Sequence, residues 1–470
     1  MVGPDAPLDP LPFHLVTLSH PDWAGALACA RGLSQDALPE LRLDLFPEGD
    51  PAARVEALGG RCLVTCRRQS EGGRWPDEDE AGRLAHLLRS LPARPAWVDL
   101  EWDLPVPPEL QAVRPGVRLL RSVHVAPGVF DLDQRLAALP EGEAFKWVGW
   151  AGRLGDCGRL RPALAWAREH GIALSAFLMG PKGLASRAMQ AAWGGAFTYA
   201  APDDGPAAAP GQIPLATLRA WRAAALHGGH GLCGVIGDPV LHSRGPAFHN
   251  PRFQQATRDL VYVPLLCGDA GEALEALEAL GILGLSITAP LKLALPQALG
   301  LEGPLNTLWR RAPGDPWQGA NTDAEALAQA LSRLAPGPVL LLGGGGVGRT
   351  SRLVLEAAGR PVLQVSRQAP VDPGAVAAFA PVGVIQATSL GMGSDDPAPF
   401  PDLLAAALPR ARWAVEWIYK EDTAFVAWAR NAGLELVSGV ALFEAQAEAQ
   451  SHRFVEACGE AGRHPIADSR

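Results

Sequence analysis

The sequence predicts an α/β protein with several domains in one chain. At 470 residues the chain is too long for a single hydrophobic core. Strand-like and helix-like segments alternate along its length, but a glycine-rich turn between a strand and a helix occurs only at 343–348. A short stretch rich in glycine and histidine, His227–Gly231, separates the two kinds of sequence and predicts a flexible joint.

The composition excludes several classes of protein. Hydrophobic residues at 48% and charged residues at 19% are typical of a soluble globular chain. The net charge of −9 argues against a nucleic-acid partner. We expect a cytoplasmic protein without a membrane partner, because there is neither a long apolar run nor a signal pattern. We expect no metal site, since Cys62 and Cys66 have no second Cys or His pair nearby.

Lysine is rare in this chain. Of 41 basic residues only four are lysine. Unlike arginine, lysine can lose its proton at a workable pH and act as a nucleophile or acid/base, so each lysine is a candidate for chemistry. Chance survival is the alternative for any one of them. The four are Lys146, Lys182, Lys292 and Lys420.

The first half predicts a (β/α)8 barrel over residues 1–226. Eight short apolar runs are separated by helix-compatible segments such as Glu78–Leu91 and Arg159–His170. An open doubly wound sheet is the alternative. The predicted strands are His14–Ser19, Leu38–Phe46, Cys62–Arg67, Ala96–Trp102, Val117–Val125, Ala144–Ala151, Ile172–Gly180 and Ala196–Ala201.

Polar residues near the ends of these strands are candidates for a site, because barrel chemistry occurs there. Lys146 lies between Phe145 and Trp147, and apolar neighbours favour the neutral amine that attacks a ketone. The alternative is a lysine whose stem packs while its ammonium reaches water. His124 is a candidate general base that Glu101 on the neighbouring strand could orient.

Ordered motifs in this half resemble those of type I 3-dehydroquinate dehydratases. They are ELRLDLF (40–46), TCRRQSEGG (65–73), VDLEW (98–102), SVH (122–124), FKWVG (145–149), MGPKGLASR (179–187) and APGQI (209–213). The resemblance implies that Lys146 forms a Schiff base, that His124 is the general acid/base and that Glu101 orients it. It also implies a substrate-binding set of Glu40, Arg42, Arg67, Arg187 and Gln212. Val125-Ala126 and Ala208 depart from the family pattern.

The second half contains a dinucleotide-binding pattern. Gly343-x-Gly345-x-x-Gly348, with Gly346 inside it, lies between a strand and a helix, where backbone N–H groups face a pyrophosphate. The next strand ends at Ser366-Arg367 without an acidic residue, which favours a ribose 2′-phosphate and hence NADP. The alternative for Arg367 is a solvated loop charge.

Catalysis in this half needs a proton donor. Lys292 follows a predicted strand, and Asp323 lies in the sequence GANTDAEAL. A lysine paired with a carboxylate can give a proton to a carbonyl oxygen as hydride arrives. The alternatives are a surface lysine and a helix-capping aspartate.

Residues from 234 onward resemble shikimate dehydrogenases. The motifs are GVIGDPVLHSRGPAFHN (234–250), SITAPLK (286–292), LNTLW (305–309), GANTDA (319–324), GGGGVGR (343–349), SR (366–367), ATSLGM (387–392) and GVALFEAQ (439–446). The resemblance implies that Lys292 and Asp323 are the catalytic pair. It implies substrate contacts from Ser243, Thr288, Asn306, Asp323, Tyr419 and Gln446, and nicotinamide contacts from Thr388, Ser389 and Met392. Gly245, Ser286, Ala324 and a shortened 418–423 segment depart from the family pattern.

Together these features predict a (β/α)8 TIM barrel fused to a shikimate-dehydrogenase-like unit with an α/β substrate domain and a Rossmann NADP domain. We expect the barrel at 1–226, a linker at 227–231, a substrate domain at 232–335 and 440–470, and a nucleotide domain at 336–439. The expected activity converts 3-dehydroquinate to 3-dehydroshikimate and reduces it with NADPH to shikimate. A dehydrogenase-like module that is inactive or acts on quinate or another ring acid is the alternative, and a homodimer is left open.

Overall fold

The structure is a computed structural model that describes residues 11–114, 116–226, 228–393 and 396–458. Residues 1–10 and 459–470 of the predicted terminal domains, and His227 of the predicted joint, lie outside these ranges. The internal contacts divide the chain into two compact units that meet between Ile282 and Leu283. Among the described helices, none combines the length and apolar character that crossing a bilayer requires.

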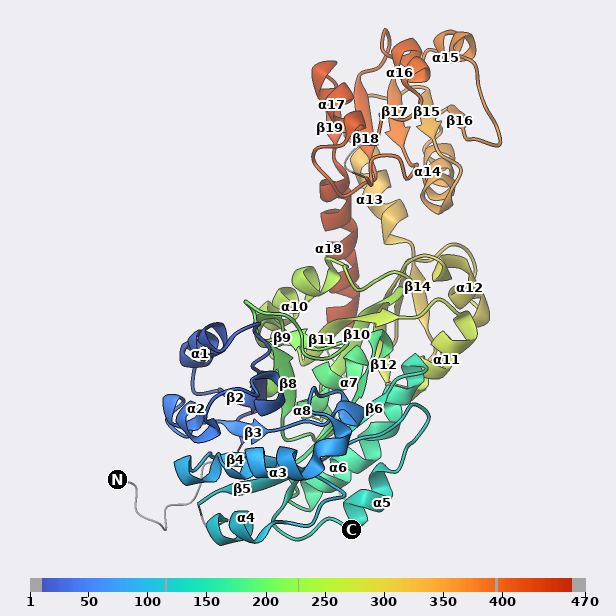
Figure 1. The fold of residues 1–470 in the computed structure, drawn as a ribbon. Helices are drawn as coiled ribbons and strands as arrows, with labels where there is room; N and C mark the ends of the chain where they lie inside the picture. Colours follow the sequence, from blue (N-terminus) through green and yellow to red (C-terminus); the bar gives the residue numbers. More distant parts are fainter. Residues whose placement is uncertain (1–10, 115, 227, 394–395, 459–470) are drawn as a thin grey trace. The chain divides into compact units, whose positions relative to one another are not determined.

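The first unit contains a curled parallel sheet of nine strands in the order β7-β6-β5-β4-β3-β2-β1-β8-β9 (Figure 1). Strand β1 pairs with both β2 and β8, and the N–H of Ala196, just before β8, donates to the carbonyl of Leu174 in β7 at 2.8 Å. The expectation of a barrel-type α/β fold is confirmed, and β9 is a strand that we did not predict. The bounds are β1 His14–Thr17, β2 Ala37–Arg42, β3 Leu63–Thr65, β4 Trp97–Glu101, β5 Arg118–His124, β6 Ala144–Trp150, β7 Leu174–Met179, β8 Thr198–Ala201 and β9 Ile213–Pro214.

Short helices follow the strands around this sheet (Figure 1). The predicted strand Leu38–Phe46 ends early, at Arg42, because Asp44 turns inward and accepts hydrogen bonds from the backbone N–H groups of Arg67 and Arg74, both at 3.0 Å. The helices are α1 Trp23–Gly32, α2 Pro51–Ala57, α3 Glu80–Leu88, α4 Pro108–Val113, α5 Leu132–Ala137, α6 Arg161–Glu169, α7 Leu184–Ala188, α8 Gln190–Trp193 and α9 Leu215–Ala220.

Residues up to Ile282 complete the first unit with two parallel strands and two helices. The helix α11 packs on the 3-10 segment Leu154–Leu160, where a Cβ on Gly158 would lie only 2.4 Å from the carbonyl oxygen of Ala279. Glu272 of this helix accepts hydrogen bonds from Lys182 Nζ at 2.8 Å and from the N–H of Leu154 at 2.7 Å, which gives Lys182 a structural partner. The elements are β10 Gly231–Gly237, α10 Gly245–Gln255, β11 Leu260–Leu266 and α11 Ala270–Ala279.

The second unit begins with antiparallel strands β12, β13 and β14 and continues into a separate parallel sheet (Figure 1). The parallel sheet has the order β16-β15-β17-β18-β19. The strand order therefore switches sides at β15: β16 is added on one side of it, and β17 to β19 are added on the other. Its strands are β15 Val339–Leu342, β16 Val362–Val365, β17 Gly383–Gln386, β18 Trp413–Glu416 and β19 Glu435–Val437. The other elements are β12 Ile282–Ile287, α12 Leu291–Ala298, β13 Thr307–Trp309, β14 Gln318–Ala320, α13 Thr322–Leu331, α14 Gly346–Ala357, α15 Pro373–Phe379, α16 Pro401–Ala407, α17 Ala424–Asn431 and α18 Gly439–Cys458.

Candidate active sites

A cavity of about 540 Å³ lies at the carboxyl ends of the barrel strands. Its lining includes seven of the eight residues predicted for the first site, which come from strands and loops spread over more than 170 positions of the chain. A parallel barrel brings the ends of all its strands together, which explains why residues so far apart in sequence meet here. The seven are Glu40, Arg42, Arg67, His124, Lys146, Arg187 and Gln212.

Lys146 projects from β6 into this cavity and is only 5% exposed. Its Nζ lies 3.8 Å from Glu40 Oε1, 3.9 Å from Asp99 Oδ2 and 3.9 Å from the ring centroid of Tyr199. Burial lowers the pKa of Lys146 to about 8, against the opposing charge of Glu40. A useful fraction of the amine is therefore uncharged near neutral pH.

His124 ends the neighbouring strand β5 on the same face as Lys146, because His124 pairs with Val148, two residues beyond Lys146. Its Nδ1 lies 2.9 Å from Glu71 Oε2. Burial, with the charge of Arg67, lowers the pKa of His124 to about 3. Although burial opposes it, the hydrogen bond with His124 and the charge of Arg67 hold the pKa of Glu71 well below its usual range. The ring is therefore neutral and can accept a proton.

Glu101 does not orient His124, contrary to our expectation. It is fully buried, accepts from Arg83 Nη1 at 2.9 Å and lies 3.5 Å from Arg67 Nη1. Its register explains this, because Glu101 pairs with Ser122, two residues before His124, and its carboxylate is held by two guanidinium groups. Glu101 is not among the residues that line the cavity.

Glu71 was missed, although it lies within the quoted motif TCRRQSEGG. The loop after β3 folds back on itself there: the N–H of Gly73 donates to the carbonyl of Arg68 at 2.8 Å. A Cβ on Gly73 would lie 1.9 Å from the carbonyl oxygen of Arg67, so this fold requires glycine. The two glycines after Glu71 could have predicted a tight turn here, which brings the Glu71 carboxylate to the cavity.

The cavity also contains Arg187, a cation for which the described part of the chain provides no counter-ion. Arg42 is paired with Asp44 at 2.6 Å, and Arg67 with Asp99 at 2.6 Å. Arg187 instead lies over the ring of Phe177 at 4.1 Å, and its buried Nε has no hydrogen-bond partner among the described residues. Burial lowers the pKa of Arg187 to about 9. Such a guanidinium is suited to an incoming carboxylate.

Gln212 also lines this cavity, in the loop that ends at β9. Its Nε2 donates to Thr17 Oγ1 at 3.0 Å and to the carbonyl of Ala200 at 3.1 Å, and its Oε1 accepts from the N–H of Ala208. Thr17 in turn donates to Glu40 Oε2 at 2.5 Å. These contacts hold the amide and the carboxylate in place before substrate arrives.

In the second unit, Lys292 Nζ donates to Asp323 Oδ2 at 2.7 Å. The two line a cavity of about 480 Å³ together with Asn306, Asn321 and Arg349 among others. Asn321 caps helix α13 by accepting the N–H of Ala324 at 3.0 Å. Asp323 is therefore not the cap, and its carboxylate is available to Lys292.

Of the other predicted substrate residues, Asn306 and Gln446 form a polar network with Thr322, and Thr288, Tyr419 and Ser243 have separate contacts. Asn306 Oδ1 accepts from the N–H of Thr322 at 2.8 Å, and Gln446 Oε1 accepts from Thr322 Oγ1 at 3.2 Å. Thr288 accepts the N–H of Leu291 through its carbonyl. Tyr419, 40% exposed, packs against Phe443 with ring centroids 5.0 Å apart. Ser243 belongs to the first unit, where its Oγ accepts from the N–H of Gly245 at 3.1 Å.

A third cavity, of about 950 Å³, opens at the carboxyl ends of β15, β16 and β17. A Cβ on Gly343 would lie 2.5 Å from the carbonyl oxygen of Ala387, and one on Gly348 only 2.3 Å from that of Gly343, so both glycines are required by close packing. A Cβ on Gly345 or Gly346 would meet nothing within 4 Å, which leaves the start of α14 open to a ligand. The lining includes Gly343, Gly344, Gly345, Arg349, Ser366, Arg367, Thr388 and Ser389.

Met392 was also predicted to contact the nicotinamide. It is 65% exposed and is not among the residues that line this cavity, and its carbonyl accepts a hydrogen bond from Lys420 Nζ. This bond gives Lys420 a local structural partner.

Arg349, one turn into α14, lines both cavities of the second unit, and we did not predict it.

Comparisons with known proteins agree with the two resemblances. Residues 15–224 match the family model for type I 3-dehydroquinase, and residues 235–302 match the model for the shikimate dehydrogenase substrate binding domain. The bifunctional 3-dehydroquinate dehydratase/shikimate dehydrogenase of Arabidopsis thaliana, described as chloroplastic, is 26% identical over 366 residues. That match covers 70% of this chain and spans 60% of the length of the relative.

Two solved structures are also similar. The dehydroquinate dehydratase and shikimate dehydrogenase from S. pombe has 19% identity and a TM-score of 0.40, with coverage of 94% of this chain and 95% of that chain. Shikimate dehydrogenase from Aquifex aeolicus has 23% identity and a TM-score of 0.41, with coverage of 51% of this chain and 100% of that chain.

Proposed function

We propose that this chain, which joins a type I 3-dehydroquinase domain to a shikimate dehydrogenase substrate binding domain, catalyses two successive steps on a ring acid. The first is dehydration of 3-dehydroquinate to 3-dehydroshikimate, and the second is reduction of that ketone to shikimate with NADPH. The observation that supports this most directly is the buried Lys146, whose pKa is about 8, in a cavity with His124 and with Arg187, which forms no ion pair with the described residues.

In the first step Arg187 binds the substrate carboxylate, and Glu40 and Gln212 bind ring hydroxyls. The neutral amine of Lys146 attacks the C3 ketone, and loss of water gives an iminium. The iminium withdraws electrons from the adjacent carbon, so the neutral imidazole of His124 can remove a proton there. The protonated imidazole of His124 then gives its proton to the departing hydroxyl of the substrate. Hydrolysis of the iminium releases the product and frees Lys146.

Glu71 has a positioning role in this scheme. By accepting a hydrogen bond at Nδ1 it fixes the tautomer of His124 and leaves Nε2 as the proton acceptor. It also stabilises the imidazolium that forms during the step. Glu101 instead forms buried ion pairs with Arg67 and Arg83.

For the second step, a nicotinamide cofactor bound at the glycine loop would supply the hydride that reduces the ketone. Lys292 gives a proton to the carbonyl oxygen, and Asp323 accepts a hydrogen bond from its ammonium at 2.7 Å and so holds it in position. Asn306, which lines the cavity with Lys292 and Asp323, together with Thr288 and Gln446, would bind ring hydroxyls. The open glycine loop at the start of α14 suits a pyrophosphate, and Arg367 in the cavity wall suits a 2′-phosphate, which favours NADP over NAD.

Two experiments test the two steps separately. Borohydride added with 3-dehydroquinate should trap a covalent adduct on Lys146, detected by peptide mass spectrometry; an active enzyme with unmodified Lys146 would end the Schiff-base proposal. Oxidation of NADPH with 3-dehydroshikimate should be normal in Lys146→Ala and lost in Lys292→Ala. Turnover that survives Lys292→Ala would exclude the proposed proton donor, and preference for quinate would redefine the substrate.

A further inference from the structure

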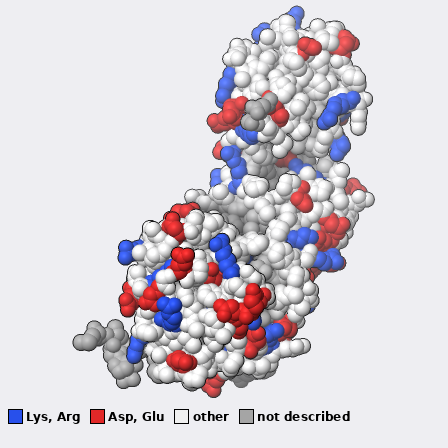
Figure 2. Space-filling view, in the orientation of Figure 1, with Lys and Arg blue, Asp and Glu red and all other residues white. Residues whose placement is uncertain are grey.

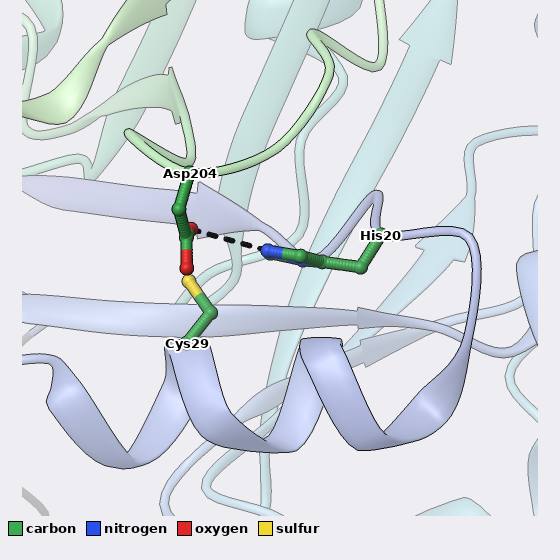
Figure 3. A group of neighbouring side chains, drawn as sticks. All are labelled: His20, Cys29 and Asp204. Carbon is green, nitrogen blue, oxygen red and sulfur yellow. Dashed lines mark hydrogen bonds and ion pairs between the residues drawn. The ribbon is translucent and has the colours of Figure 1, made fainter.

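Apart from the residues of the cavity, three side chains of the first unit form a cluster of His, Cys and Asp, which are residue types that bind metal ions. His20 follows β1, Cys29 lies in α1 and Asp204 lies in the loop between β8 and β9 (Figure 3). One ligand atom from each, the His20 Nε2, the Cys29 Sγ and an Asp204 carboxylate oxygen, lies within 4.8 Å of the other two. The sequence does not reveal this group, because 175 positions separate Cys29 from Asp204.

The three side chains already point toward one another. His20 Nε2 lies 3.1 Å from Asp204 Oδ1, and the sulfur of Cys29 faces the same carboxylate (Figure 3). The ring of His20 is 8% exposed, and its other nitrogen, Nδ1, is buried without a hydrogen-bond partner among the described residues. Its contact with Asp204 is therefore the polar interaction that orients the ring.

We propose that His20, Cys29 and Asp204 form a zinc site with one open coordination position. The ligand set of one nitrogen, one sulfur and one oxygen is among those that zinc accepts. Metal–ligand bonds of 2.0 to 2.3 Å place the ligand atoms of a tetrahedral site roughly 3.3 to 3.6 Å apart, so side-chain adjustments of less than about 1.5 Å suffice. A water molecule would complete the tetrahedron.

The charges also balance. Zinc binding replaces the thiol proton of Cys29, which leaves as H⁺, so a thiolate and the Asp204 carboxylate together neutralise the 2+ charge while His20 binds as neutral imidazole. When His20 binds zinc through Nε2, its buried Nδ1 carries a proton for which the described residues provide no acceptor. We therefore expect weaker zinc binding than at a structural site where the second ring nitrogen of the histidine donates a hydrogen bond.

Zinc here would hold the loop that forms one wall of the first cavity. Asp204 begins the loop that includes Ala208, Pro210 and Gln212 of the cavity lining. Ser19, beside His20, donates a hydrogen bond to the carbonyl of Pro206 in the same loop. Zinc would therefore tie this loop to α1 and the turn after β1, at a site separate from the cavity lining.

The test uses the full-length chain without an affinity tag, stripped with a chelator and dialysed against zinc chloride. We expect one zinc per chain by elemental analysis, and a thiolate-to-metal charge-transfer band when cobalt(II) replaces zinc. Cys29→Ser and Asp204→Asn should each lower zinc affinity by more than about a hundredfold, since even residues that only support a ligand contribute ten- to a hundredfold. Zinc should raise the unfolding temperature of the unchanged chain but not of these variants.

Asp203→Asn is the matched control. Asp203 is the adjacent carboxylate in the same loop, and its Oδ1 accepts the N–H of Ala216, which an asparagine oxygen can also do. This variant should bind zinc like the unchanged chain. The proposal is overturned if the unchanged chain binds no zinc, if the cobalt form lacks the charge-transfer band, or if Cys29→Ser and Asp204→Asn retain full affinity while circular dichroism shows them folded.

Discussion

The imidazole Nδ1 of His124 lies 2.9 Å from Oε2 of Glu71. Glu71 precedes His124 by 53 positions and belongs to the loop after β3, which turns back toward the cavity. This contact, rather than one with Glu101, sets the tautomer of the ring. Glu71 also pairs with Arg67 at 3.1 Å and Arg68 at 2.8 Å, so its carboxylate stays charged beside the neutral ring. The orientation of His124, the proposed acid/base, therefore depends on a loop and not on the neighbouring strand.

We predict that Glu71→Gln lowers kcat for dehydration of 3-dehydroquinate by about a hundredfold, because the amide cannot stabilise the imidazolium. Steady-state kinetics at saturating substrate measure this. Glu101→Gln is the comparison: it should lower the unfolding temperature, since it leaves Arg83 without its buried partner, and should change kcat less. Equal kcat in Glu71→Gln and the unchanged enzyme would remove Glu71 from the mechanism.

Dehydration should depend on pH through Lys146. The attacking form is the neutral amine, and the pKa of Lys146 is about 8, so kcat/KM should rise by about tenfold per pH unit well below 8 and level off above it. The pH profile of kcat/KM measures the ionisation of the free enzyme. A profile that is flat between pH 6 and 9 would contradict a free lysine with this pKa as the nucleophile.

Substrate binding should depend on Arg187. Arg187→Gln removes the unpaired guanidinium while keeping a polar side chain, and we expect KM for 3-dehydroquinate to rise roughly ten- to a hundredfold, the usual contribution of a charged hydrogen bond. Initial-rate kinetics test this. Arg153→Gln is a suitable control, since Arg153 is half exposed and pairs with Glu275 outside the cavity. An unchanged KM in Arg187→Gln would place the carboxylate elsewhere.

The contact between Lys182 and Glu272 should contribute to stability. Glu272→Ala leaves the Lys182 ammonium and the N–H of Leu154 without their acceptor, and we expect a loss of about 2 kcal/mol in the free energy of unfolding of the first unit. Denaturant unfolding followed by tryptophan fluorescence measures this. Glu275→Ala on the same helix, at an exposed ion pair, should cost much less. Equal losses in the two variants would contradict a specific role for Glu272.

Stability of the second unit should depend on pH through Glu416. This carboxyl is fully buried at the end of β18, and burial raises its pKa to about 7. The folded chain therefore holds a proton that the unfolded chain releases near pH 4.5, so the free energy of unfolding falls by about 3 kcal/mol as pH rises from 4.5 to 7. Glu416→Gln should abolish this part of the pH dependence in urea titrations; an unchanged pH dependence would contradict it.

Local patterns predicted most of the secondary structure. All eight barrel strands lie within the predicted ranges to within a few residues, since runs of apolar residues between polar segments identify buried strands. The glycine spacing at 343–348 predicted the turn between β15 and α14, where close packing permits no side chain at Gly343 or Gly348. The charges are interspersed on the face shown in Figure 2, where Lys and Arg lie among Asp and Glu.

The sequence by itself determined that the chain joins a barrel-type α/β fold to a unit that resembles shikimate dehydrogenases, and it predicted Lys146 and Lys292 as the candidate reactive amines. The pairing of Lys292 with Asp323 was expected, but only the tertiary structure showed that Glu71 meets His124 and that Asp204 meets His20. Strand and helix patterns reflect neighbours within a few residues. Ion pairs between distant loops depend on where the chain returns in space, and spacing along the sequence does not specify that.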